Sequence, residues 1–336
     1  NIRSYLASSY IWERLLHLPE KVFDAVVDTN VIVLRKTDEE ISKNKSVVVD
    51  VMHGEQASLL HLLDGEFIPK NGDPINIVAE PSKQVLVRKI FISTQPLANL
   101  FGVYNGIKPF EIGKGQPPQT EKIARGQIYV KEGEKPNESW SPLLRGSLID
   151  RYENKWKNNY WVQYGIWLAA PRDPRIFEAS LKIVVRQTGD SIIATVIEAG
   201  FIARNNLHII LEKDSGHNLK YLLGLMNSKL MDFAYSFINP EKGEALAEVK
   251  KKHVEQLPVR VIDFTNPADV KRHDRMVALV QRMLDLHKQL AAALLPQEKD
   301  LLDRQIAATD AQIDRLVYDL YDLTEEEIRL VEGKEG

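Results

Sequence analysis

Cationic and aromatic side chains are interleaved between residues 140 and 190. This stretch carries eight Lys or Arg against five Asp or Glu, and four of the five tryptophans of the chain. Phosphates attract such cations and bases or sugars stack on such rings, so the composition is typical of a nucleic-acid interface. The alternative is a core of rings at alternate strand positions with the charges outside. We expect core for Trp161 and Trp167, and leave Tyr152 and Trp156 open between core and surface.

Two groups of polar residues in this stretch predict different roles in DNA binding. Arg151, Lys155 and Lys157 follow a Gly-Ser turn in a hydrophilic segment, where long cations can reach phosphates whatever the base. Arg186 and Gln187 end a predicted strand, and their side chains can pair bidentately with guanine and adenine. For Arg186 an internal ion pair, for instance with Asp190, remains open.

The sequence contains few signs of catalysis. It has no cysteine, no Gly-x-Gly-x-x-Gly turn and no serine in a nucleophile-elbow context. Glu248-Val-Lys250 with Asp232 fits part of a nuclease motif, but both lie in a predicted helix, so we expect a solvated charged face. His53 and His61 are eight residues apart, which does not suit a helical metal pair. The residues alone therefore do not indicate a complete enzyme.

Length and charge limit the remaining possibilities. The chain has 336 residues, 44 Lys and Arg and 47 Asp and Glu, with a net charge of −3. This length suggests two or three domains, and the charge excludes a surface that is basic throughout. Residues 266–336 hold 15 acidic and 10 basic side chains, so a basic face belongs upstream of them. No apolar run is long enough to cross a membrane. We expect a soluble, cytoplasmic protein cut from something longer.

The apolar pattern predicts a helix followed by strands, then a long mixed region, then helices. An apolar stripe from Ile2 to Leu16 indicates a helix, and the run Val31–Leu34 indicates a strand buried on both faces. Frequent turn signals between residues 46 and 213 indicate short strands. The predicted strands are residues 160–168, 182–187, 192–197 and 207–211.

The C-terminal third returns to helical spacing. Residues 217–237 predict a helix, and residues 254–262, interrupted by Pro258, an edge segment. Heptad-like apolar positions before and after Pro296 predict an antiparallel helical hairpin, because proline is tolerated in the first turn of a new helix. Thr324 and Glu327 have the spacing of a capping box that begins one more short helix.

Several segments of the sequence resemble one known family. They are Gly102-Val-Tyr-Asn-Gly-Ile-Lys-Pro-Phe110, Pro142-Leu-Leu-Arg-Gly146 with Asp150-Arg-Tyr152, and Lys182-Ile-Val-Val-Arg-Gln-Thr-Gly-Asp190. Together they are similar to the TaqI-like specificity domain at the C-terminus of adenine-specific DNA methyltransferases in type IIG restriction–modification enzymes. Residues 222–230 and 257–259 resemble the end of the same module. Residues 310–328 resemble the helical tail of these enzymes, and residues 23–34 the last strands of their methyltransferase domain.

The resemblance implies a methyltransferase parent whose chemistry lies elsewhere. The family's Asn-Pro-Pro-Tyr motif, which holds a flipped adenine, is absent from the sequence, as is the glycine-rich loop that binds S-adenosylmethionine. We therefore expect no cofactor and no catalytic or metal-binding residue in this chain. The parent enzyme would need S-adenosylmethionine, and Mg²⁺ if it also carries a nuclease.

Taken together, we expect a mixed α+β fold with a mixed sheet followed by a long antiparallel helical hairpin. The predicted domains are a methyltransferase remnant over 1–45, a target-recognition domain over 46–264 and the hairpin over 265–336. The predicted partners are double-stranded DNA and an upstream methyltransferase domain. Two alternatives are a stand-alone specificity subunit of a type I-like restriction system and a carbohydrate-binding or scaffold protein. The candidate DNA-binding residues are Asn105, Lys108, Arg145, Arg151, Tyr152, Lys155, Trp156, Lys157, Arg186 and Gln187.

Overall fold

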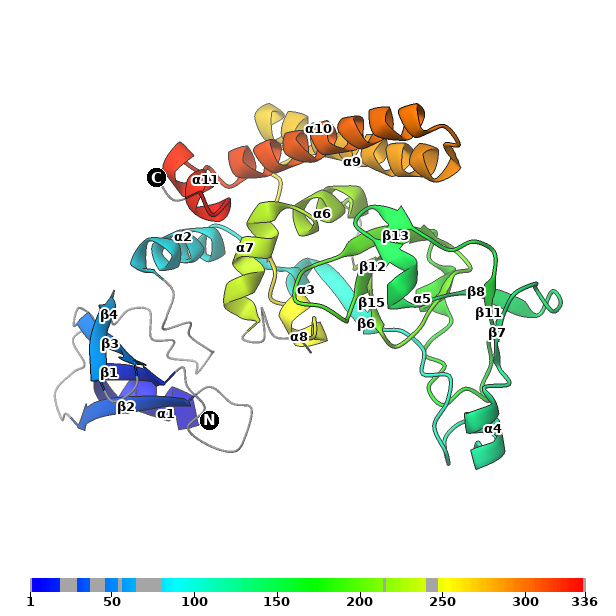
Figure 1. Cartoon of the computed structure of the whole chain (residues 1–336), viewed down its shortest axis with the longest axis horizontal. Coiled ribbons are helices and arrows are strands. Elements are labelled where there is room, and N and C mark those ends of the chain that lie inside the picture. Colours follow the sequence, from blue (N-terminus) through cyan, green and yellow to red (C-terminus); the bar gives the residue numbers. More distant parts are fainter. Residues whose placement is uncertain are drawn as a thin grey trace. The chain divides into compact units, whose positions relative to one another are not determined.

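A computed structural model forms two compact units, residues 1–90 and residues 91–336. Figure 1 shows the elements of both units in chain order. The residues that the structure describes are 2–18, 29–36, 46–53, 56–64, 80–213, 216–239 and 247–334.

The first unit is a small mixed sheet with helices before and after it in the sequence. Its elements are α1 (Ile2–Ser9), β1 (Tyr10–Leu18), β2 (Thr29–Lys36), β3 (Ser46–His53), β4 (Gln56–Asp64) and most of α2 (Pro81–Ile92). The strand order is β2-β1-β3-β4, with β1 antiparallel to β2 and parallel to β3. Leu15, Val47, Val49 and Leu63 form its core together with Ala7.

Two predictions for this unit are wrong. The apolar stripe from Ile2 to Leu16 is helical only as far as Ser9, and its second half is strand β1. Strand β2 exists, but it lies at the edge of the described sheet, and Val31, Ile32 and Val33 are 46%, 41% and 43% exposed. The apolar positions of the stripe fit a helix and a strand equally well, and only the pairing with β2 and β3 decides between them.

The predicted domain boundary after residue 45 falls in the segment 37–45, which lies outside the described residues. Strands β2 and β3 on either side of that segment belong to one sheet. The three domain assignments remain predictions.

The second unit contains the remaining strands. They are β5 (Gln95–Pro96), β6 (Phe101–Asn105), β7 (Val130–Glu132), β8 (Trp140–Leu144), β9 (Ile149–Asp150), β10 (Glu153–Asn154), β11 (Tyr160–Gln163), β12 (Leu181–Arg186), β13 (Ala194–Glu198), β14 (Ile202–Ala203), β15 (Leu207–Glu212) and β16 (Pro258–Val259). The predicted strands at 182–187, 192–197 and 207–211 are confirmed as β12, β13 and β15, and the strand predicted at 160–168 is shorter.

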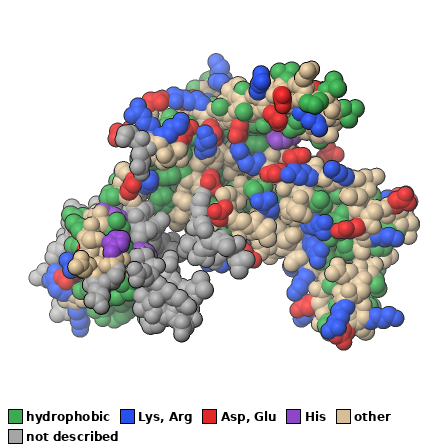
Figure 2. Space-filling view, viewed as in Figure 1, with side chains coloured by type: hydrophobic (Ala, Val, Ile, Leu, Met, Phe, Trp, Pro, Cys, Tyr) green, Lys and Arg blue, Asp and Glu red, His purple; other side chains and the backbone are tan. Residues whose placement is uncertain are grey.

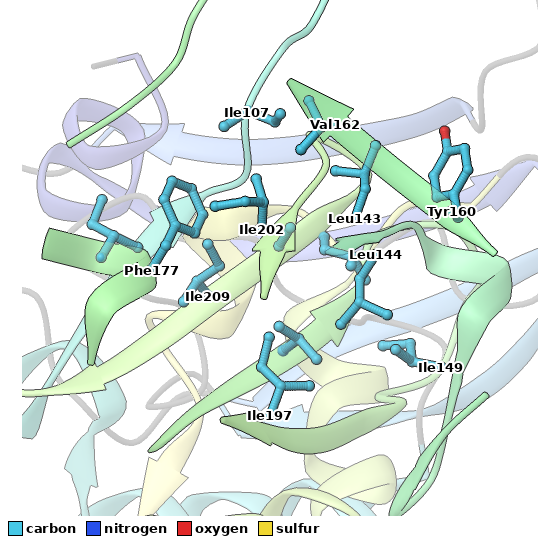
Figure 3. Packing of buried hydrophobic residues seen from close by; sticks show 14 of the residues in the cluster. Ile107, Leu143, Leu144, Ile149, Tyr160, Val162, Phe177, Ile197, Ile202 and Ile209 are labelled. Atoms are coloured by element: carbon cyan, nitrogen blue, oxygen red, sulfur yellow. The ribbon is translucent and has the colours of Figure 1, made fainter. Parts of the chain in front are cut away.

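Two four-stranded sheets enclose the main core of this unit. One has the order β13-β12-β15-β6 and is antiparallel throughout, and the other has the order β14-β8-β11-β7. Leu143 and Leu144 of β8 belong to the same buried cluster as Ile209 of β15 and Ile107. Figure 3 shows these side chains together with Ile202, gathered from both sheets. Burial of apolar surface between the sheets stabilises the scaffold that positions the strand ends.

Helices make up the rest of the second unit. They are α3 (Leu97–Leu100), α4 (Glu121–Gly126), the 3₁₀ turn η2 (Gly146–Leu148), α5 (Arg175–Glu178), α6 (Leu219–Met226), α7 (Lys229–Ile238), α8 (Lys251–Val254), α9 (Pro267–Ala292), α10 (Pro296–Leu320) and α11 (Glu325–Val331). The helix predicted at 217–237 is two helices, because Ser228 caps the start of α7 and bonds the N–H of Met231.

The predicted helical hairpin is confirmed. Helices α9 and α10 lie side by side (Figure 1), and Leu286, Ala293 and Leu302 pack between them. Thr324 and Glu327 form the predicted capping box of α11. The mixed α+β fold with a C-terminal helical hairpin is therefore as expected.

Helix α6 approaches the hairpin closely at Gly224. A Cβ atom on Gly224 would lie 2.4 Å from Sδ of Met276 in α9. The missing side chain therefore allows α6 to pack directly on the hairpin.

Candidate nucleic-acid interface

The turn Arg204–Asn206 connects the ends of three segments that are far apart in the sequence. The N–H of Asn205 donates to the carbonyl of Ile107 (2.8 Å), and the N–H of Arg204 donates to Leu144 (2.9 Å). The carbonyl of Asn206 accepts from the N–H of Gln187 (3.0 Å). The start of β15 therefore holds the ends of β6, β8 and β12 together.

This turn brings together four of the predicted DNA-binding residues. Asn105 ends β6, Arg145 directly follows β8, Arg186 ends β12 and Gln187 follows it. We call these four residues and Asn206 the strand-end cluster. All are side chains that can pair with base edges or phosphates, and they lie at one end of the two sheets.

Close approach of the backbones makes this arrangement compact. A Cβ atom on Gly106 would lie 2.2 Å from the carbonyl oxygen of Arg204, so only glycine fits there. The N–H of Gly146 donates to Oδ1 of Asn206 (3.2 Å), and a Cβ atom on Gly146 would lie 3.1 Å from Cγ of Arg186. A larger residue at Gly106 would push the strand ends apart, whereas one at Gly146 would press on the Arg186 side chain.

Each arginine of the strand-end cluster uses only part of its guanidinium in the contacts described here. Arg145 stacks on the ring of Tyr160, 4.7 Å from its centroid, and pairs with Glu132 at 3.1 Å. Arg186 donates from Nε to the carbonyl of Thr188 (3.0 Å). Within the described residues Arg186 forms no ion pair with Asp190, so that internal alternative is absent there. Contacts of this kind fix each guanidinium in one orientation.

Gln187 and Lys157 have the least internal engagement of the predicted residues. Among the described residues, neither side chain has a hydrogen-bonding or ion-pair partner. Lys157 is exposed and Gln187 is half-buried. Lys108 instead pairs with Glu111 (2.6 Å), and the bond from Lys108 holds the pKa of the Glu111 carboxyl below its ordinary value.

Most of the predicted phosphate-binding segment has partners inside the protein. We call its five predicted residues, Arg151, Tyr152, Lys155, Trp156 and Lys157, the 151–157 segment. Arg151 forms a bidentate pair with Asp310 of α10, with N–O distances of 2.6 and 3.2 Å, and also donates to the carbonyl of Asn227 (2.7 Å). Bidentate pairs between arginine and a carboxylate are among the strong charge-assisted bonds. Arg151 thus ties the segment to the helices.

The two aromatic residues of this segment are not freely exposed rings. Tyr152 is 3% exposed and has a φ of 61°, and its N–H donates to the carbonyl of Ala194. The possibility that Tyr152 lies at the surface is therefore wrong, because neighbouring strands and helices cover its ring. Trp156 is half-buried, lies 5.1 Å edge-on from both Trp161 and Phe201, and donates to the carbonyl of Tyr160.

Lys155 is held near the start of the segment by an acidic neighbour. Its ammonium lies 2.7 Å from Asp150 and 3.9 Å from Glu153. Burial raises the pKa of the Asp150 carboxyl, but the bonds from Lys155 and from the N–H of Arg151 outweigh it, and the net shift of that pKa is downward. Lys155 therefore already has carboxylate partners within the chain.

The two tryptophans expected in the core lie there. Trp161 is 4% exposed, and the half-buried ring of Trp167 packs against the main core cluster. Both therefore support the sheets and are not available as stacking surfaces for bases.

Residues 204–206 and His208 were missed by the sequence reasoning. The Arg-Asn-Asn stretch directly before a predicted strand is a turn signal, because Asn tolerates turn geometry and bonds neighbouring backbone groups. That signal predicts a turn, but it does not reveal the three segments that the turn joins. His208, at 3% exposed, carries no signal beyond its place in an apolar strand.

Charge and metal-ligand chemistry give no second site in the part of the chain described here. Figure 2 shows Lys and Arg side chains mixed with Asp and Glu over the visible face. The described residues contain no group of three or more side chains that could hold a metal ion. None of the described helices is both long and apolar enough to cross a membrane.

Comparison with known families gives one match, over residues 141–259, to the TaqI-like C-terminal specificity domain. This segment is similar to that domain. It runs from β8 to β16 and includes Arg145, Arg186 and Asn206. The resemblance stated from sequence motifs is thereby confirmed for the motifs at 142–152, 182–190, 222–230 and 257–259.

Three solved structures resemble the chain at low sequence identity, and no curated protein matches it in sequence. The type IIL restriction-modification enzyme MmeI in complex with DNA is 10% identical, with a TM-score of 0.48, over 97% of this chain and 46% of that chain. The type IIG restriction endonuclease BpuSI is 12% identical, with a TM-score of 0.38, over 95% and 45%. The HsdS subunit from Thermoanaerobacter tengcongensis is 11% identical, with a TM-score of 0.29, over 76% and 51%. The chain spans about half the length of these structures.

Proposed function

We propose that this chain is the sequence-reading part of an adenine-specific DNA methyltransferase of a restriction–modification system. The single observation that carries the proposal is the match of residues 141–259 to the TaqI-like specificity domain. In this role the chain binds double-stranded DNA and positions the target adenine, flipped out of the stack, for a methyltransferase domain upstream. An enzyme acting on cellular DNA in this way would work in the cytoplasm.

The strand-end cluster is the proposed reading surface. Arg186 and Gln187 lie together at the end of β12, and the arginine–guanine and glutamine–adenine pairs are the common bidentate contacts in the major groove. Lys157 and Lys108 are exposed or half-exposed cations suited to phosphates. Base contacts would supply specificity, and phosphate contacts would supply register and much of the affinity.

The described residues of the first unit offer no glycine turn for S-adenosylmethionine. A tight turn that lets the backbone approach such a cofactor needs glycine, and the described residues of the first unit contain none. We therefore propose that the cofactor binds to the upstream methyltransferase domain, where it supplies the transferred methyl group. Any Mg²⁺ would belong to a nuclease domain of the parent enzyme.

Binding-site selection from randomised duplex DNA tests the proposal with the chain itself. We expect one enriched consensus and binding that weakens steeply with salt, because phosphate contacts release counterions. A chain that enriches no sequence, or whose binding hardly changes between about 50 and 200 mM salt, would overturn the proposal. Salt-insensitive binding to polysaccharide would favour the carbohydrate-binding alternative.

The methylation half of the proposal needs the full-length protein. Incubated with tritiated S-adenosylmethionine, that protein should label adenine in a duplex that carries the selected consensus. A matched duplex with one consensus base pair changed is the control and should be labelled far more weakly. Label in cytosine would contradict the assignment to adenine.

A further inference from the structure

The buried His208 forms a polar pair with Asn105 of the strand-end cluster. They face each other across the antiparallel pairing of β15 with β6, and Nδ1 of His208 lies 3.0 Å from Oδ1 of Asn105. Nε2 of the same ring lies 2.7 Å from the carbonyl oxygen of Val249. The imidazole is 3% exposed, whereas Asn105 is an exposed residue. The ring therefore has one partner inside the protein and one that reaches the surface.

The carbonyl of Val249 decides which nitrogen of a neutral ring carries the proton. A carbonyl only accepts, so Nε2 must donate to it, and Nδ1 of a neutral imidazole is then an acceptor. The N–H of Val249 donates to the carbonyl of Gln187 (2.7 Å), which ties this backbone to the end of β12 beside the ring. The geometry thus leaves Nδ1 in need of a donor.

The charge of the His208 ring determines which end of the Asn105 amide can form a hydrogen bond with Nδ1. With its oxygen toward Nδ1, the amide suits a protonated imidazole, which donates from both nitrogens. With its nitrogen toward Nδ1, the amide suits a neutral imidazole. A half-turn of the amide exchanges the two atoms at almost the same positions, so the ring's charge decides which one faces outward.

The surroundings of His208 favour the neutral ring. Burial lowers the pKa of the imidazole and outweighs the bond to Val249, which raises it. The charged groups that act on the ring come from the segment around α8: Lys251 lowers the pKa, and Glu248 and Glu255 raise it. The net shift is downward from the ordinary value, so the ring is neutral at pH 7 and above.

We propose that His208 is a positioning residue that holds the Asn105 amide with its oxygen outward, so that Asn105 reads an adenine. After donating one hydrogen to Nδ1, the amide still presents its oxygen and a second N–H. These are the acceptor and donor that match N6 and N7 of adenine in the major groove. This inference rests on the proposed function, because it assigns one contact within the reading surface.

The state of the ring can be measured without DNA. In nitrogen–proton correlation spectra of the ¹⁵N-histidine-labelled chain at pH 7.5, assigned with His208→Gln, His208 should carry its proton on Nε2 and none on Nδ1. A proton on Nδ1, whether alone or in addition to one on Nε2, would overturn the inference, since Asn105 would then face the ring with its oxygen.

The reading role is tested by binding-site selection with variants of both residues. His208→Gln keeps an amide donor that can reach Val249 but removes the acceptor at Nδ1, so it should fold and release Asn105. We expect His208→Gln and Asn105→Ala to lose preference at the same A·T pair, by about tenfold or more. Asn99→Ala, an exposed asparagine before the other end of β6, is the control and should keep the consensus.

The outcomes separate this inference from the proposed function. An unchanged consensus for Asn105→Ala, a lost G·C pair, or a folded His208→Gln with the full consensus would each overturn the inference while leaving DNA recognition in place. Failure of the wild-type chain to select any consensus would overturn the proposed function, and the assignment of an adenine would fall with it. The spectra of the DNA-free chain test the His208–Asn105 geometry whether or not the chain selects a consensus.

Discussion

The strand-end cluster and the 151–157 segment both contain cations, but their surroundings differ most at Arg151 and Tyr152 of the segment. In the cluster, backbone bonds hold the strand ends together, and side chains such as Gln187 keep their pairing groups free among the described residues. In the segment, Arg151 is bound to Asp310 and Asn227, and Tyr152 is buried. The difference shows that a cation next to aromatic residues is as suitable for bracing two parts of a protein as for binding DNA.

The 151–157 segment also connects β9, β10 and β13 to the hairpin. Asn227 bonds the backbone of Ala194 through both its amide oxygen (3.1 Å) and its amide nitrogen (3.0 Å), and its carbonyl accepts from Arg151. The N–H of Lys229 donates to Asp314 of α10 (2.9 Å), and burial raises the pKa of that carboxyl. The hairpin therefore acts as an intramolecular brace for β9, β10 and β13.

The largest loss of stability is predicted for Arg151→Ala. This change removes three hydrogen bonds and leaves Asp310 without its partner, so we expect the free energy of unfolding to fall by about 2–3 kcal/mol. Chemical denaturation of the chain measures it. Arg282→Ala, an exposed arginine of α9, is the matched control and should change stability by less than about 0.5 kcal/mol. Equal stabilities of the two variants would contradict the bracing role.

A second prediction compares the two ends of β12. Arg186 at its end belongs to the strand-end cluster, whereas Lys182 near its start has a structural role. The ammonium of Lys182 is fully buried, and its hydrogen-bond partners among the described residues are the carbonyl oxygens of Phe177, Ala179 and Glu198. Burial lowers the pKa of Lys182 to about 8. Its protonation should therefore affect stability above about pH 8.

The sign of the pH effect follows from that shift. Between pH 8 and about 10.5 the unfolded chain binds more protons at Lys182 than the folded chain, so this group's contribution to stability rises with pH. Relative to Lys182→Met, we expect the free energy of unfolding of the wild type to rise by about 2 kcal/mol from pH 8 to pH 10. Denaturation of both proteins at the two pH values measures the difference. A difference that stays constant or falls would show that the ammonium is not held in a dry site.

The smallest effect is expected for Lys157→Ala. Lys157 has no partner among the described residues, so its loss should leave stability unchanged and weaken binding to all duplexes alike. The slope of log affinity against log salt should decrease by about one unit. Titrations of the selected duplex and of a scrambled duplex at several salt concentrations measure this. A changed base preference for Lys157→Ala would assign it to the reading set instead.

Sequence reasoning succeeded where the deciding interactions are local. The capping box at Thr324 and Glu327 and the hairpin around Pro296 follow from neighbours within one or two turns, and strands β12 and β15 follow from β-branched runs. The helix predicted for the second half of the stripe from Ile2 to Leu16 was wrong because strand pairing, which is not local, decides its structure.

The roles of the cations could not be predicted because their partners are distant in sequence. Arg151 resembles a phosphate contact beside Lys155 and Lys157, and only its pair with Asp310, 159 residues away, shows the bracing role. The turn Arg204–Asn206 likewise gains its meaning from the segments that end near it, which no local pattern connects to it.

Binding-site selection with three single variants of this chain tests most directly whether the strand-end cluster reads bases and the 151–157 segment does not. For folded Arg186→Ala and Gln187→Ala we predict a consensus relaxed at one base pair each, with a loss of about 1–3 kcal/mol on the wild-type site. For Arg151→Ala, compared at a temperature where it is folded, we predict the wild-type consensus. An unchanged consensus for both cluster variants, together with a changed one for Arg151→Ala, would contradict the assignment of the two regions.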